Sequence, residues 1–270
     1  MAAQFTLSLL LGSAFVLVGR PAGEVCAQDA PVDSIVASVR EHLSACDSQF
    51  AEFTFVGMLT ERELRDDGTV KSAKVSKTRH FVRGEETREV LEAMWEDGEQ
   101  IPQSKLNDER EKRAKERAKQ QKRIADGEDD ESARSATILE PFREAHKDNY
   151  RFPLAVTETV GSVPCWKISV EPTRSYEKLV KGFAWVEQGS MRPVREEYDM
   201  AKRPGPVKDF GIVMVHDPVT NNCAFPSLFQ LHVRGKALLF IKFNVDVELH
   251  LDSLQLNPRL PDSLFASPVE

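Results

Sequence analysis

The sequence lacks the short motifs that mark the common enzyme and nucleotide-binding classes. It has no Gly-x-Ser-x-Gly nucleophile elbow, no phosphate-cradling glycine loop and no dinucleotide fingerprint. Its 6 histidines are scattered, and none has the His-x-His or His-Glu-x-x-His spacing that brings two ring nitrogens onto one metal ion. We therefore predict no catalytic residues, no metal site, no cofactor and no enzymatic activity. A hydrolase would require the fold to place a histidine and a carboxylate around an exposed nucleophile.

An excess of positive charge is also missing, because 36 Lys and Arg face 43 Asp and Glu and give a net charge of -7. The most basic segment, Lys105 to Arg123, has no interleaved aromatic residues for base stacking, and the acidic run Asp126 to Glu131 follows it. Acidic side chains precede basic ones by four positions in this segment, which is typical of a solvent-exposed helix. We predict no nucleic-acid partner.

Long apolar runs occur only near the N-terminus. Phe5 to Val18 has the length of a signal-peptide core and is too short to span a membrane comfortably. Val25-Cys26-Ala27 offers small residues for signal peptidase, so we predict a signal peptide at 1–27, cleaved before Gln28. Lipoprotein anchoring at Cys26 is the alternative, although Val25 is a poor residue before the lipidated cysteine. The predicted location is the periplasm or the extracellular medium, with no membrane-spanning segment in the mature protein.

Three cysteines remain after the predicted cleavage, Cys46, Cys165 and Cys223, and an odd number argues against a disulfide framework. One bridge could form in an oxidising compartment. Cys165 and Cys223 are the candidate pair, because both lie in strand-like segments. The alternative is that the thiols are free and buried.

The mature chain predicts an α+β fold with a large antiparallel sheet and helices gathered on one side. A first helix with apolar residues from Ile35 to Cys46 is capped by Asp33 or Ser34. A second, short amphipathic helix carries Ile138, Leu139, Phe142 and Ala145. The clearest strand is Lys242 to Leu251, where apolar and polar residues alternate strictly. The predicted strands are 50–64, 70–83, 87–96, 150–160, 165–170, 181–187, 192–200, 210–216, 224–234 and 242–251. We predict one domain at 28–258, with a charged helical insertion at 103–135 and a C-terminal tail at 259–270.

Two neighbouring strands carry a family resemblance. Gly182-Phe183-Ala184-Trp185-Val186-Glu187, followed by Met191-Arg192-Pro193-Val194-Arg195-Glu196-Glu197, resembles the LolA-type lipoprotein-carrier superfamily. Phe53-Thr54-Phe55, the charged helix and Gly235 to Phe240 resemble a bacterial branch of outer-membrane lipoprotein-sorting-type proteins. The resemblance implies an open half-barrel whose apolar concave face is covered by helices and shelters acyl chains. The chain departs from that pattern in its longer insertion and in Ala224-Phe225-Pro226, where relatives often carry Trp-Leu-Pro.

The predicted function is therefore that of a periplasmic carrier that binds lipid or lipoprotein acyl chains in an apolar half-barrel cavity of the bacterial cell envelope. The alternative is an envelope-stress sensor or protein-interaction module that docks an envelope protein through the charged insertion. Candidate cavity residues are aromatic or aliphatic and lie in predicted strands, although ordinary core packing would use the same residue types. These candidates are Phe53, Phe55, Trp166, Ile168, Val170, Phe183, Trp185, Phe243, Val245, Val247 and Leu249.

Overall fold

A computed structural model describes residues 31–84, 86–125, 140–176, 179–220, 223–237 and 241–266. These residues belong to one compact unit that begins at Pro31. The predicted signal peptide, Cys26 and the acidic run at 126–131 lie outside the described residues. So do Ile138 and Leu139, which begin the predicted second amphipathic helix.

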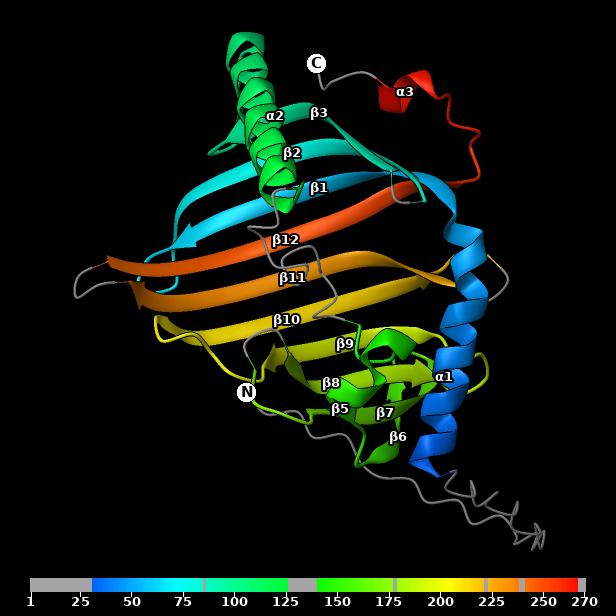
Figure 1. The fold of residues 1–270 in the computed structure, drawn as a ribbon. Helices are drawn as coiled ribbons and strands as arrows, with labels where there is room; N and C mark the ends of the chain where they lie inside the picture. The colour runs from blue at the N-terminus through cyan, green and yellow to red at the C-terminus, as the bar shows by residue number, and fades with distance from the viewer. Residues whose placement is uncertain are drawn as a thin grey trace, which may run out of the picture. The chain divides into compact units, whose positions relative to one another are not determined.

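The unit is built on a curved antiparallel sheet of twelve strands, so the predicted fold class is confirmed (Figure 1). The strand order is β4-β3-β2-β1-β12-β11-β10-β9-β8-β7-β5, with β6 paired to β7, and the sheet stays open. The last strand of the chain therefore lies in the middle of the sheet, between β1 and β11. The strands are β1 (Glu52–Leu64), β2 (Val70–Arg83), β3 (Glu86–Glu96), β4 (Glu99–Gln100), β5 (Tyr150–Arg151), β6 (Ala155–Val160), β7 (Val163–Pro172), β8 (Val180–Glu187), β9 (Pro193–Met200), β10 (Val207–Pro218), β11 (Ala224–Ala237) and β12 (Ile241–Leu256).

The register assigns each side chain to one of two faces of the sheet. Val247 of β12 pairs with Leu231 of β11, and Leu249 pairs with Phe229, so the apolar row of β12 continues across its neighbour. The same face carries the helices α1 and α2, and we call it the inner face. The opposite, outer face carries the polar row of β12. The apolar residues of β12 thus point to the face that carries the helices, and its polar residues point to the solvated face.

Helix α1 (Val32–Asp47) packs its apolar stripe against the inner face of β7 to β10 (Figure 1). No side chain caps its N-terminus, so the predicted caps Asp33 and Ser34 are wrong. Pro31 stands at the N-cap instead, and its carbonyl accepts the amides of Ser34 and Ile35. The core beneath α1 consists of Ile35, Val36, Val39, Phe142, Tyr150, Trp166, Ile168, Val170, Leu179, Val180, Ala184, Val186, Tyr198, Ile212 and Met214.

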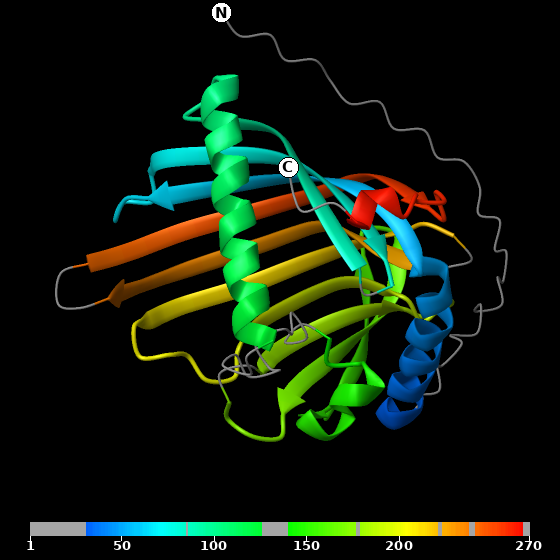
Figure 2. The ribbon, with the colours of Figure 1, turned by 45° about the horizontal axis from the view of Figure 1, so that its top comes forward.

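Helix α2 (Gln103–Ala125) forms within the predicted insertion, and its first turns are anchored to the sheet. Leu106 is buried against Leu91 and Met94 of β3, and the Arg110 guanidinium donates to the Leu91 carbonyl. In both views the helix then runs across the front of the sheet (Figures 1 and 2). Neither α2 nor any other helix in the described ranges is long and apolar enough to cross a membrane.

Two short segments differ from the predicted elements because of proline. The predicted strand 150–160 is divided into β5 and β6, and Pro153, which has no amide to donate to a ladder, lies between them. After Pro141 the chain forms the 3-10 helix η4 (Glu144–Asn149) instead of continuing an α-helix. Phe142, just before η4, is 2% exposed and closes the core under α1.

The chain after β12 lies against β2 and β3. Residues 259–266, part of the predicted tail, include the short helix α3 (Ser263–Ala266). Arg83 pairs with Asp262 at 2.7 Å and lies over the Phe265 ring. Arg88 donates to the Leu264 carbonyl at 2.5 Å. Two arginines from neighbouring strands thus hold this end of the chain in place.

Candidate functional site

The helices cover the inner face unevenly. Helix α1 buries the side chains of β7 to β10, and the first turns of α2 bury those of β3. Between these regions, Leu59 of β1 and Val245, Val247 and Leu249 of β12 are only half-buried. We call these four residues the central strip, and no described helix packs on it. The strip is an apolar row that the described residues leave partly open to solvent, bordered on the β1 side by Glu61 and Glu63, which pair with Val247 and Val245.

A pocket of about 400 Å³ lies at one end of the strip, between the C-terminal half of α1 and the sheet. Strand β1 connects the two, because Phe53, Phe55, Gly57 and Leu59 alternate onto the inner face. The pocket is lined by His42, Leu43, Cys46, Asp47, Phe50, Phe53, Glu140, Pro141, Phe142, Arg143, Pro193, Glu196, Met214, His216, Ala224, Phe225 and Pro226.

Four phenylalanines form the junction between pocket and strip. Phe225 contacts Phe50, Phe53 and Phe55, with ring centroids 5.6–5.9 Å apart. Phe55 also stacks on the His80 ring at 4.4 Å. Aromatic rings in such contacts supply large apolar area with little rotational freedom. The junction therefore forms an apolar wall between the pocket and the central strip.

The polar groups of the pocket lie on α1, β9, β10 and the segment 140–143. Glu196 on β9 and His216 on β10 face each other across the ladder, with Oε1 and Nε2 3.5 Å apart. Arg143 pairs with Asp47 of α1 at 2.6 Å. Within the described ranges, no three His, Cys, Asp or Glu side chains come together as a metal site. The pocket thus combines an apolar wall with a few charged side chains, as ligand pockets commonly do.

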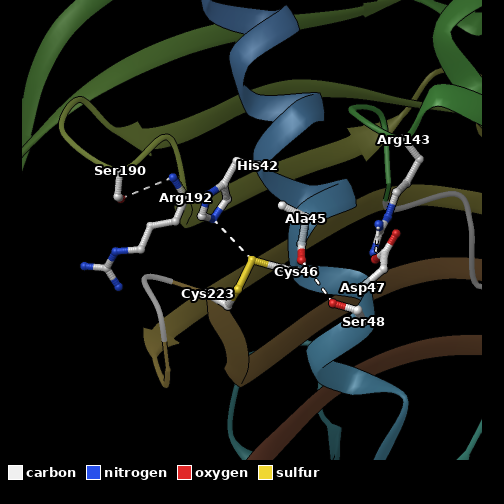
Figure 3. The surroundings of a disulfide bond; sticks show 9 residues. All are labelled: His42, Ala45, Cys46, Asp47, Ser48, Arg143, Ser190, Arg192 and Cys223. Atoms are coloured by element: carbon white, nitrogen blue, oxygen red, sulfur yellow. Dashed lines mark hydrogen bonds and ion pairs between the residues drawn. A yellow bond between two sulfur atoms is a disulfide. The ribbon is translucent and has the colours of Figure 1, made fainter.

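A disulfide joins Cys46, at the end of α1, to Cys223, just before β11 (Figure 3). The predicted pair Cys165–Cys223 is wrong, and Cys165 is a buried free thiol. Strands β8, β9 and β10 separate Cys165 on β7 from β11, whereas α1 spans these strands and delivers Cys46 to Cys223. Cys46 lines the pocket, so the bridge fixes one wall of it.

His42 lies one turn before Cys46 on α1, with Nε2 3.6 Å from the Cys46 Sγ (Figure 3). Partial burial, and secondly the positive charge of Arg192, lower the pKa of His42 below its usual value of 6.5. The unfolded chain therefore binds more protons than the folded one between the two pKa values. The free energy of unfolding therefore decreases as the pH falls below about 6.5, because His42 takes up a proton more readily in the unfolded chain. Above about pH 6.5 this loss of stability is absent.

We expect an NMR titration of the His42 ring to show a pKa below 6.5. Arg192→Gln should move this pKa upward, because it removes the nearby positive charge. His42→Gln should make the melting temperature less dependent on pH between about 5 and 7. Titration of His42 at or above 6.5 in the native protein would contradict this account.

The structure divides the predicted cavity residues into four groups. Trp166, Ile168 and Val170 lie on the inner face but are buried in the core under α1. Residues at the junction or in the central strip are Phe53, Phe55, Val245, Val247 and Leu249. Phe243 shares their face but borders a separate hollow beside Leu64 and Gly235. The last group, Phe183 and Trp185, lies on the outer face.

The outer-face position of Phe183 and Trp185 follows from the register. Trp185 pairs with Lys167, whose ammonium lies 4.8 Å from the Trp185 ring and 4.9 Å from the Phe183 ring. Lys167 points away from the face that carries Trp166 and Ile168, because neighbours on a strand alternate. Phe183 and Trp185 therefore cannot line the same cavity as the central strip.

Several pocket residues were not among the predicted cavity residues, notably Phe50, Phe225, Glu196 and His216. The sequence contains a signal for Glu196, because it lies two residues before the buried Tyr198 on β9 and therefore points to the same face. A carboxylate at an inward position of an amphipathic strand is unusual. No local pattern predicts that α1 and the segment 140–143 line the pocket, because this depends on how distant elements pack.

Comparisons with known proteins place this geometry in context. The chain matches no protein-family model and no curated protein. Among solved structures, it is similar to a DUF1329 family protein from Desulfovibrio piger, with 11% identity, 89% of this chain and 99% of that chain covered, and a TM-score of 0.44. It is also similar to a domain assigned to outer membrane lipoprotein sorting from Vibrio parahaemolyticus, with 10% identity, 87% and 97% covered, and a TM-score of 0.42.

A LolA superfamily protein from Nitrosomonas europaea is similar at 11% identity, with 88% of this chain and 98% of that chain covered and a TM-score of 0.35. The identities are low, so the function has to be argued from the geometry of this chain.

Proposed function

We propose that this chain is a binding protein that shelters the acyl chain of a lipid or lipoprotein against its inner face. The supporting observation is the half-open central strip, which β1 joins to a pocket of about 400 Å³. Pockets that hold small ligands typically measure roughly 300–1,000 Å³ and are mostly apolar. The phenylalanine junction gives a continuous apolar path from one to the other.

Burial of methylene groups supplies the affinity. Each methylene removed from water contributes about 0.8 kcal/mol, so an acyl chain that buries eight of them gains about 6 kcal/mol. Such binding requires no catalytic group. The ligand is held by its apolar area and is released when another apolar surface competes for it.

We place this function outside the cytoplasm, in the periplasm or the secreted medium. The bridge between Cys46 and Cys223 supports this, because structural disulfides form and persist in oxidising compartments. The predicted signal peptide at 1–27 points the same way. A carrier in this location would move an acylated client through the bacterial envelope.

Uptake of a fluorescent fatty acid by the purified protein tests the proposal. Val247→Glu should weaken uptake at least 10-fold, because it places a carboxylate in the middle of the apolar strip. Val215→Glu is the matched control, since Val215 is a half-buried valine on the outer face and pairs with Arg195. Circular dichroism and melting temperature establish that both variants fold.

Two results would count against the proposal. The wild-type protein would show no saturable uptake, or Val215→Glu would lose as much uptake as Val247→Glu. Native mass spectrometry of protein purified from its own envelope provides an independent readout, and co-purified lipid is the expected result.

A protein-interaction module is the second candidate, and the exposed part of α2 favours it. Lys112, Lys115 and Lys119 are exposed beyond the anchored start of the helix. Changing these three residues to glutamine leaves Leu106 and Arg110 intact. Loss of a specific envelope partner in pull-down experiments with fatty-acid uptake intact would support this role; an unchanged set of partners would oppose it.

A further inference from the structure

We propose that the pocket under α1 binds a positively charged headgroup, so that the preferred ligand is an amphiphile with an ammonium group. This inference rests on the proposed acyl-chain site and specifies the chemistry at the pocket end of that site. The observation that carries it is a buried carboxylate without a fixed positive partner.

That carboxylate belongs to Glu196, which is 5% exposed and lines the pocket. Its Oε2 is buried and makes no hydrogen bond of standard geometry to a described residue, although the neutral Tyr198 hydroxyl interacts with the carboxyl group. His216 and Tyr198 adjoin the carboxyl group, and neither carries a fixed positive charge. No lysine or arginine in the described ranges forms an ion pair with Glu196. Because a buried charge is costly unless it is paired, an incoming cation would supply the missing partner.

The remaining charged side chains of the pocket do not offset Glu196. Among the described residues that line the pocket, Arg143 is the only lysine or arginine, and it pairs with Asp47 at 2.6 Å and with Glu140 at 3.6 Å. Figure 3 shows its guanidinium turned toward Asp47. Nearby Arg192 is paired with Glu187. Three carboxylates and one guanidinium leave the lining with a net charge of about -2 while its histidines are neutral.

The aromatic residues of the lining favour the same ligand. Phe50, Phe53 and Phe225 border the pocket and contact one another at 5.7–6.0 Å between ring centroids. The faces of aromatic rings attract ammonium groups, most strongly where water is excluded. An ammonium headgroup at Glu196 would therefore have apolar rings beside it, and its alkyl tail could follow β1 to the central strip. A carboxylate headgroup would meet unpaired negative charge instead.

Calorimetric titration of the full chain with dodecylamine, dodecanol and laurate tests the inference, with each ligand kept below its critical micelle concentration. We expect dodecylamine to bind at least 10-fold more tightly than laurate. Glu196→Gln keeps the shape of the side chain, and it should weaken dodecylamine about 10-fold while leaving dodecanol unchanged. Glu197→Gln is the matched control, because Glu197 is the next residue on β9, faces outward and pairs with Arg195.

The outcomes separate this inference from the proposed function. If none of the three ligands binds, the acyl-chain site itself is refuted. If all three bind with equal affinity, the acyl-chain site stands and the cation-binding inference is overturned. The comparison of dodecylamine with laurate on the wild-type protein needs no substitution, so it decides the matter even if Glu196→Gln fails to fold.

Discussion

Replacing Cys46 or Cys223 by serine is expected to lower the free energy of unfolding by about 2–5 kcal/mol. The two cysteines are 177 positions apart, so their bridge removes much of the conformational freedom of the unfolded chain. Denaturant titration measures the effect. The bridge also fixes the end of α1 over the pocket, so fatty-acid uptake should weaken in the same variants.

A reducing agent provides the control for this prediction. The wild-type protein should lose stability in dithiothreitol, whereas Cys46→Ser should be insensitive to it. Cys165→Ala removes the free thiol and should leave the response to dithiothreitol unchanged. Equal stability of the wild-type protein with and without reductant would contradict the prediction.

Gly182→Ala is expected to lower the free energy of unfolding by about 3 kcal/mol or more. Gly182 has a φ of 152°, and a Cβ atom there would lie 2.0 Å from the carbonyl oxygen of Glu197. That oxygen belongs to the backbone of β9, so it cannot move aside without disturbing the β8–β9 ladder. The disturbance would reach Tyr198, which pairs with Gly182 and is buried in the core.

Gly189→Ala is the matched control for this substitution. Gly189 lies in the turn after β8, and a Cβ atom there would meet nothing within 4 Å. The free energy of unfolding of the Gly189→Ala variant should stay within about 0.5 kcal/mol of the wild-type value. Urea titration of the two variants side by side tests the prediction, and a similar small effect of both would refute it.

Strand positions could be predicted from the sequence because period-two alternation is a local property. The segment Lys242 to Leu251 predicts β12, and the structure confirms the strand. The predicted strand ends at Leu251 because the alternation fails at Asp252 and Ser253, whereas the strand in the structure continues to Leu256. Ser253 has a φ of 53°, which marks a local irregularity within a strand that still pairs with β1.

Alternation cannot say which face of a strand is covered. Phe183 and Trp185 must share a face, and their residue types favour the core. The structure places them outside, where the Lys167 side chain shields Trp185, and the small Ala184 faces the core instead. The choice depends on where α1 packs, which involves residues far away in the sequence.

The pocket could not be predicted for the same reason. Its lining comes from α1, Phe50 just after it, the segment 140–143 and four strands, and the disulfide partner of Cys223 depends on the path of α1. The inward position of Glu196 was detectable, but its lack of a fixed positive partner was not. That property belongs to the assembled side chains and has no local pattern.

The central position of β12 has a consequence for how this protein is made. During synthesis, β1 has a free edge on the side away from β2 until residues 241–256 follow. The N-terminal and C-terminal parts of the sheet can each form early, but they join only through the last strand. Strand pairing across so long a stretch of chain is slow, and the unpaired edges are prone to aggregation. A chain truncated shortly before residue 241 would therefore yield two incomplete sheets, even though most of the sequence is present.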